Sequence, residues 1–237
     1  MRRRARAFTL IELLVVISII ALLVGILLPV LAAARRSAVR MRCQANLRTV
    51  HQTFHAYAAE HEGEVPIGYR GGTMQWNTMI YSNTADIYVL FGHVYKAGYM
   101  HAPEAFYCPA ETSPGQMFNT DENPWPPPDI PDHLTGIQGG YGSRPVVGWG
   151  WAQWPPRMPQ LDDLRREAIF ADTVGTYERV DTRHGTGVNV LYGDSAVHWV
   201  PRPLFDEPLS RSTHISPAGE FNDEQWEIWQ IWLCTLL

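Results

Sequence analysis

Four side chains in the C-terminal third of the chain are of types that bind metal ions. His184, Asp194 and His198 lie close together in the sequence, and Asp172 precedes them. Imidazole nitrogens and carboxylate oxygens are competent metal ligands. A structural reading competes with this one, in which Asp194 shapes a turn and His184 hydrogen-bonds a neighbouring loop. The pattern therefore marks a head turn or a weak metal site, and we expect no cofactor.

A second set of histidines, on a helical segment, has the spacing of a zinc-protease signature. The three residues are His51, His55 and His61. Such a site needs a glutamate general base after the first histidine and a glycine before the third, whereas this chain has Gln52 and Ala58. We therefore expect histidines that face solvent. The sequence also contains no nucleophile elbow, phosphate loop or supported pair of catalytic carboxylates, so we predict that the protein is not an enzyme.

Three tryptophans, Trp149, Trp151 and Trp154, lie among glycines and prolines. Aromatic side chains in such loops stack on sugars or partner proteins, and they also fill small cores and subunit interfaces. The sequence leaves both readings open.

A single carboxylate, Glu12, lies at the start of a long apolar segment. Residues 13–34 carry no charge, which reaches the roughly 20 residues needed to cross a bilayer. An ionised carboxylate near the hydrocarbon costs roughly 2.5 to 3.5 kcal/mol, so it needs a partner. Arginines flank the segment on both sides, and the positive-inside rule therefore does not set its orientation. Because the basic residues gather there, nothing indicates binding to nucleic acid.

The helix is predicted to continue beyond the apolar segment. Apolar residues recur every three or four positions from Val39 to Tyr57, which is the period of one helical face. A helix over residues 8–61 would be roughly 80 Å long. Pro29 is expected to bend it, because proline removes a backbone hydrogen bond.

The remaining residues, 62–237, are predicted to form a small α+β domain, which we call the head. The patterns predict a helix over 84–98, an exposed loop over 112–136, a buried strand over 168–171, a hairpin with strands 188–192 and 196–200, and a helix over 222–236. The tryptophan-rich final helix is too short to span a membrane and is expected to cover the core.

The N-terminal segment resembles the cleavage and methylation segment of type IV prepilins and type II secretion pseudopilins. Residues 7–16 read AFTLIELLVV. The resemblance implies that a prepilin peptidase removes residues 1–7, cutting between Ala7 and Phe8, and methylates the new N-terminus. The family usually has glycine where this chain has Ala7. The freed Phe8 amine of one subunit would neutralise Glu12 of its neighbour during filament assembly.

A second segment is similar to the His-x9-Asp-Gly segment of prepilin-like proteins abundant in planctomycetes. It runs from His184 to Asp194, with Ser195 in the glycine position, so the turn is expected to shift to Gly193-Asp194. Three shorter pieces of the head look like the same family: FYCPA at 106–110, YG at 141–142 and FAD at 170–172.

The resemblance implies a pilin-like fold of class α+β, with a long N-terminal helix and an antiparallel sheet in the head. The implied domains are a leader (1–7), a transmembrane half-helix (8–34), an amphipathic half-helix (35–61) and the head (62–237). The chain would cross the inner membrane once, with its N-terminus in the cytoplasm and its head periplasmic or extracellular. Its partners would be prepilin peptidase, other pilin-like subunits, inner-membrane lipid and the secretion or pilus assembly machinery.

Two alternatives remain at this level. A secretory signal peptide also combines a basic start with an apolar stretch, although its apolar region is shorter and rarely begins with glutamate. An exported, membrane-tethered module could instead use its aromatic loops to capture polysaccharide or a partner protein. The three cysteines, Cys43, Cys108 and Cys234, allow three disulfide pairings or free buried thiols.

Overall fold

The computed structural model describes residues 9–67, 70–71, 74–75, 78–82, 87–127, 136–144, 158–172, 177–211 and 223–234. The chain divides into two compact units, Met1–Val39 and Arg40–Leu237. The division falls within the long helix α1 (Leu10–Glu60), because side chains of this helix from Cys43 onward belong to the core of the second unit.

The part of α1 in the first unit is apolar and exposed. Its large apolar side chains between Leu10 and Leu31 are all at least 44% exposed. The helix is long and apolar enough to cross a membrane. α1 continues through Pro29 without interruption, and the expected bend at this residue stays a prediction.

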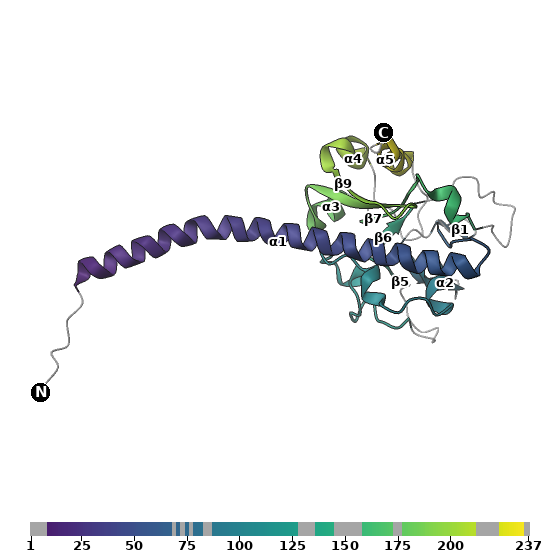
Figure 1. Cartoon of the computed structure of the whole chain (residues 1–237), viewed down its shortest axis with the longest axis horizontal. Helices are drawn as coiled ribbons and strands as arrows, with labels where there is room; N and C mark the ends of the chain where they lie inside the picture. Colours follow the sequence, from purple (N-terminus) through teal and green to yellow (C-terminus); the bar gives the residue numbers. More distant parts are fainter. Residues whose placement is uncertain are drawn as a thin grey trace, which may run out of the picture. The chain divides into compact units, whose positions relative to one another are not determined.

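The second unit is built around a four-stranded antiparallel sheet. The strand order is β6-β7-β8-β9, from β6 (Tyr141–Ser143), β7 (Ala168–Asp172), β8 (Gly187–Tyr192) and β9 (Val197–Pro201). Figure 1 shows the C-terminal part of α1 on one side of this sheet, and α4 (Asp206–Arg211) and α5 (Asp223–Cys234) on the other. The predicted strand and hairpin are therefore confirmed.

A hydrophobic cluster lies on each face of the sheet, which explains why β7 and β8 are buried at every position. Phe170 and Leu191 pack with the apolar face of α1, whereas Val190 and Tyr192 pack with Trp232 of α5. Neighbouring strand residues point to opposite faces, so Asp172 lies on the same side as Phe170, toward α1. The final helix thus covers the core, as its tryptophan spacing predicted.

Two smaller sheets complete the strands in the described residues. One has the order β4-β3-β5, from β4 (Ile87–Tyr88), β3 (Met79–Ser82) and β5 (Ile137–Gln138), and the other joins β1 (Arg70–Gly71) to β2 (Met74–Gln75). These elements confirm the expected α+β architecture, with a long N-terminal helix and a head with antiparallel sheets.

The helix predicted over 84–98 is wrong at Ile87 and Tyr88, and residues 84–86 lie outside the described part. Ile87 pairs with Ser82 as part of β4, and helix α2 covers only Phe91–Lys96. Gly92 approaches the Ile80 carbonyl so closely that an added Cβ would lie 2.0 Å from its oxygen. Pairing with β3 therefore overrides the helical spacing in this segment.

The loop over 112–136 is less exposed than expected. Its described part includes a 3₁₀ turn (Pro114–Gln116) and the fully buried Asn123. The Asn123 side chain exchanges hydrogen bonds with the backbone of Gln138, at 2.9 Å in each direction. The loop is thereby fastened to β5, and residues 128–135 lie outside the described part.

The hairpin turn is centred on Gly193 and Asp194, as expected. Ser195 has a φ of +74°, and its N–H donates to the Tyr192 carbonyl at 3.0 Å. The Asp194 carboxylate accepts a hydrogen bond from the Ala196 N–H at 2.9 Å. The expected shift to Gly193-Asp194 is therefore confirmed: these two residues lie at the centre of the turn, and Ser195 occupies the left-handed position that follows it, which costs more for serine than for glycine.

Candidate functional site

Glu12 closes a capping box at the start of α1. Its carboxylate accepts hydrogen bonds from the Thr9 N–H and hydroxyl, both at 2.8 Å, and its own N–H donates to the Thr9 hydroxyl at 3.2 Å. This reciprocal pattern satisfies N–H groups that a helix start leaves without partners. Within one chain Glu12 thus holds the first turn together. The processing residues Ala7 and Phe8 lie outside the described residues.

The histidine and aspartate predicted beyond His184 lie apart from it on the hairpin. Asp194 is exposed in the turn, and His198 is exposed on β9, where its ring lies edge-on to Tyr192 with a centroid distance of 5.5 Å. His184 instead follows α3 (Tyr177–Arg183) and turns inward. The structure does not bring the three residues together.

His184 meets a different set of ligand-type side chains, which we call the Cys-Asp-His cluster: Cys43, Cys108, Asp172 and His184. Their ligand atoms all lie within 4.8 Å of one another. The two Sγ atoms are 3.8 Å apart, and Cys108 Sγ is 3.5 Å from His184 Nε2. The Cys43 thiol donates to Asp172 Oδ1 at 2.8 Å, and His184 Nε2 is 3.3 Å from Asp172 Oδ2.

Four separate elements supply these side chains. Cys43 lies on the apolar face of α1, and Cys108 follows the 3₁₀ turn Pro103–Phe106. Asp172 ends β7 on the α1 side of the sheet, and His184 directly follows α3. All four belong to the unit that begins at Arg40. The cluster therefore joins α1 to three segments of the head.

The surroundings of the cluster shift its protonation equilibria in opposite directions. Burial raises the pKa of the Cys43 thiol, and the neighbouring Cys108 and Asp172 add to this effect. The contact with Cys43 lowers the pKa of Cys108 to about 7, although burial opposes it. Burial disfavours protonated His184, but the Asp172 carboxylate and Cys108 outweigh this and raise its pKa to about 10. The shift in the pKa of His184 therefore favours its charged form.

A buried arginine lies next to the cluster. Arg183 forms an ion pair with Glu111 and donates hydrogen bonds to the Gly140 carbonyl at 3.0 Å and to Gln116 Oε1 at 2.7 Å. Its positive charge acts on both cysteines. Burying an arginine requires such partners, and the Glu111 carboxylate balances its charge.

Two of the four side chains in this cluster are predictable from the sequence as candidate ligands, His184 and Asp172. Cys43 and Cys108 are expected only as free thiols or disulfide partners. The cysteines carry no Cys-x-x-Cys spacing. A usable signal was present in the position of Cys43, which shares the apolar face of α1 with Leu47 and so had to point into the head.

The stem histidines do not all face solvent as predicted. His51 is buried, and its Nε2 lies 2.9 Å from the Gly193 carbonyl oxygen in the hairpin turn. His61 stacks on Tyr57 with a ring centroid distance of 3.7 Å, and His55 is exposed. The expectation is wrong for His51, because the turn approaches α1 at this point. Trp149, Trp151 and Trp154 lie outside the described residues.

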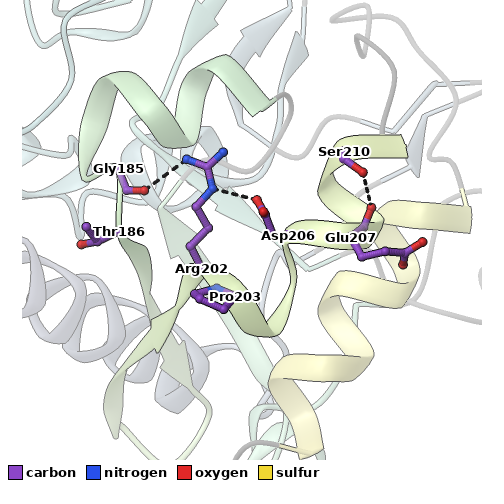
Figure 2. Close-up of a pocket in the computed structure, with 7 residues that line it drawn as sticks. All are labelled: Gly185, Thr186, Arg202, Pro203, Asp206, Glu207 and Ser210. Atoms are coloured by element: carbon purple, nitrogen blue, oxygen red, sulfur yellow. Dashed lines mark hydrogen bonds and ion pairs between the residues drawn. The ribbon is translucent and has the colours of Figure 1, made fainter.

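An open hollow is lined by Gly185 and Thr186, which follow His184, and by residues of the segment 202–210. Figure 2 shows Arg202 in it, pointing its guanidinium toward the Gly185 carbonyl at 3.2 Å and toward Asp206 at 2.8 Å. Arg202 also pairs with Asp181. Arg202, which directly follows β9, is thus engaged by acidic side chains of α3 and α4 and fastens these two helices to the end of the strand.

Comparison with known protein families places one motif on the chain. Residues 2–28 match the family model described as the prokaryotic N-terminal methylation motif. This match supports a prepilin-type protein and confirms the resemblance drawn from the N-terminal residues. No curated protein and no solved structure matches the chain. The likeness of the C-terminal segment to planctomycete proteins stays a prediction.

Proposed function

We propose that the chain is a structural subunit of a pilin-like filament, either a type II secretion pseudopilus or a type IV pilus-like fibre. The observation that carries the proposal is the methylation motif over residues 2–28. The motif supports a subunit that prepilin peptidase cleaves and methylates and that assembles with other pilin-like subunits. Cleavage would fall between Ala7 and Phe8.

Glu12 would guide assembly by changing its hydrogen-bond partner. In one chain its carboxylate accepts two hydrogen bonds from Thr9. These bonds lower the cost of placing it near hydrocarbon but leave its charge uncompensated. The methylated amine of Phe8 on a neighbouring subunit would supply the opposite charge. Two groups that are each costly in a membrane would thereby stabilise one another and set the axial register of the filament.

The exposed apolar part of α1 supports the same role. Side chains such as Leu14, Leu22 and Leu27 are more than 60% exposed and lie on different sides of the helix. A helix that is apolar all round is stable only when lipid or other helices surround it. We infer that inner-membrane lipid covers it before assembly and that sister helices cover it afterwards, with the head on the periplasmic or extracellular side.

Substitution of Glu12 by alanine tests this proposal. The Glu12→Ala chain should insert into the membrane and be processed, but it should be depleted from filaments by at least tenfold, which corresponds to about 1.4 kcal/mol per subunit contact. Filaments sheared from cells and the membrane fraction are compared by immunoblot. Ser18→Ala is the matched control, because Ser18 lies in the same apolar segment and bonds only the Leu14 carbonyl in its own helix.

Normal incorporation of Glu12→Ala would overturn the proposal. A membrane-tethered binding module predicts instead that the wild-type chain and Glu12→Ala both stay in the membrane fraction and that neither enters sheared filaments, since a tether needs no partner for its carboxylate. Substitution of Ser18 should leave both fractions at wild-type levels.

A further inference from the structure

We propose that Cys43, Cys108, Asp172 and His184 together bind a structural zinc ion that fastens α1 to the head. The inference does not depend on filament assembly, because it rests on side chains of the unit that begins at Arg40.

The distances within the Cys-Asp-His cluster fit a tetrahedral zinc site. With Zn–S bonds of about 2.3 Å and Zn–N bonds of about 2.0 to 2.1 Å, a tetrahedron has S–S edges of about 3.8 Å and S–N edges of about 3.5 Å. The corresponding separations here are 3.8 Å between the sulfurs and 3.5 Å from Cys108 Sγ to His184 Nε2. Cys43 Sγ and Asp172 Oδ1, at 2.8 Å, must move apart by less than about 1 Å, and all four ligand atoms lie within 4.8 Å of one another.

The donor set favours zinc over other common ions. Two thiolates and an imidazole are ligands for zinc, whereas magnesium and calcium prefer oxygen ligands alone. Four protein ligands fill the tetrahedral coordination shell, and Cys43, Cys108 and Asp172 are buried. A closed site of this kind has no position for water or substrate, so its role is structural rather than catalytic.

Neighbouring side chains hold the ligands in place. Asn189 donates to Asp172 Oδ2 through its backbone N–H at 2.6 Å and its side chain at 3.1 Å, which fixes the carboxylate and leaves Oδ1 toward Cys43. The Trp199 ring lies edge-on to His184 at 5.7 Å. Such outer contacts orient metal ligands and raise affinity. Zinc with two thiolates and one carboxylate leaves one negative charge, and Arg183, which also pairs with Glu111, interacts favourably with both thiolates.

A disulfide between Cys43 and Cys108 fits the same atoms less well. It would require the sulfurs to approach from 3.8 Å to about 2.05 Å. It would also remove the thiol that donates to Asp172 Oδ1, and a buried acceptor without a donor is costly. Zinc instead gives every ligand atom in the cluster a partner.

The test uses the full chain, without a histidine tag, purified in mild detergent and in the absence of chelators. Plasma mass spectrometry should find about one zinc ion per chain. Replacing zinc with cobalt(II) should give the intense visible bands of a tetrahedral site and a thiolate-to-cobalt charge-transfer band. Denaturing mass spectrometry with alkylation should show Cys43 and Cys108 as free thiols.

Ligand variants locate the ion. His184→Ala and Cys108→Ser should each reduce zinc retained against a fixed chelator concentration by more than about tenfold. His198→Ala is the matched control, because His198 is exposed on the neighbouring hairpin and should leave retention unchanged. The cobalt spectrum of the unsubstituted chain remains decisive if a ligand variant fails to fold.

Three results would overturn the proposal. One is a Cys43–Cys108 disulfide in a chain without zinc, and another is a metal-free chain in which both thiols are free. The third is zinc that survives His184→Ala but is lost in His198→Ala, which would move the site to the hairpin.

Discussion

Two carboxylates, Glu12 and Asp172, show how surroundings decide what one chemical group does. Glu12 lies in an exposed helical turn and accepts bonds from Thr9, which leaves it free to exchange partners. Asp172 is buried and accepts bonds from Asn189 and Cys43 on fixed elements. The first group therefore suits assembly, and the second suits a permanent structural contact.

At this scale we predict that Asp172→Ala destabilises the head far more than Asp194→Ala. Removing the Asp172 carboxylate leaves the buried His184 without its charged partner, a loss that typically costs about 3 to 5 kcal/mol. Removing Asp194 breaks one exposed hydrogen bond to Ala196, worth about 0.5 to 1.5 kcal/mol. Urea unfolding of the full chain in detergent, followed by tryptophan fluorescence, measures both. Equal losses would contradict the assigned roles.

Among the elements, the hairpin β8–β9 and helix α1 support one another through a narrow contact. The Gly193 carbonyl oxygen lies 2.9 Å from His51 Nε2. On the other side of the turn, a Cβ at Gly193 would lie 2.1 Å from the Leu164 carbonyl oxygen. The glycine at this position is therefore required by close approach and not by a positive φ.

We accordingly predict that Gly193→Ala destabilises the head by about 1 to 3 kcal/mol, because the Leu164 backbone must move. Gly115→Ala is the matched control, since its nearest contact would be 3.6 Å from a flexible Glu122 side chain. Thermal unfolding of the two variants compares them directly. A Gly193 variant as stable as the Gly115 variant would show that the turn is not tightly packed against Leu164.

The elements also show what the sequence could and could not predict. Periodicity located α1, β7, the hairpin and α5, since each buries a continuous apolar face. It failed at Ile87, where helical spacing competes with pairing to β3, because packing and pairing in a sheet can outweigh local helical periodicity. It also missed Cys43 and Cys108 as partners of His184, because no local spacing links α1 to segments more than 60 residues away.

For the whole molecule, we assign different roles to the two ends of α1. The N-terminal end carries the exposed apolar surface and the capping box, which on the proposed function would contact the membrane and then neighbouring subunits. The C-terminal end shares a hydrophobic core with the head and contributes Cys43 to the cluster. A zinc ion bound by Cys43 and the three ligands of the head would hold the C-terminal end of α1 rigidly against the head.

Removal of zinc by a chelator tests whether the Cys-Asp-His cluster stabilises the folded chain. At free zinc about 1,000 times above Kd, binding stabilises the folded state by about 4 kcal/mol. For a chain of this size we predict that chelation lowers the thermal midpoint by roughly 10 °C and that added zinc restores it. Cys108→Ser should show no such response to chelator. A wild-type midpoint that is indifferent to chelation would contradict a structural metal.

The central claim, that the chain is a processed pilin-like subunit, is tested most directly by the intact mass of the mature protein from its native membrane. Our account predicts a chain that begins at Phe8, has lost residues 1–7 and carries one added methyl group. A chain that begins at Arg35, as a secretory signal peptide would leave it, or one that retains Met1, would contradict the account.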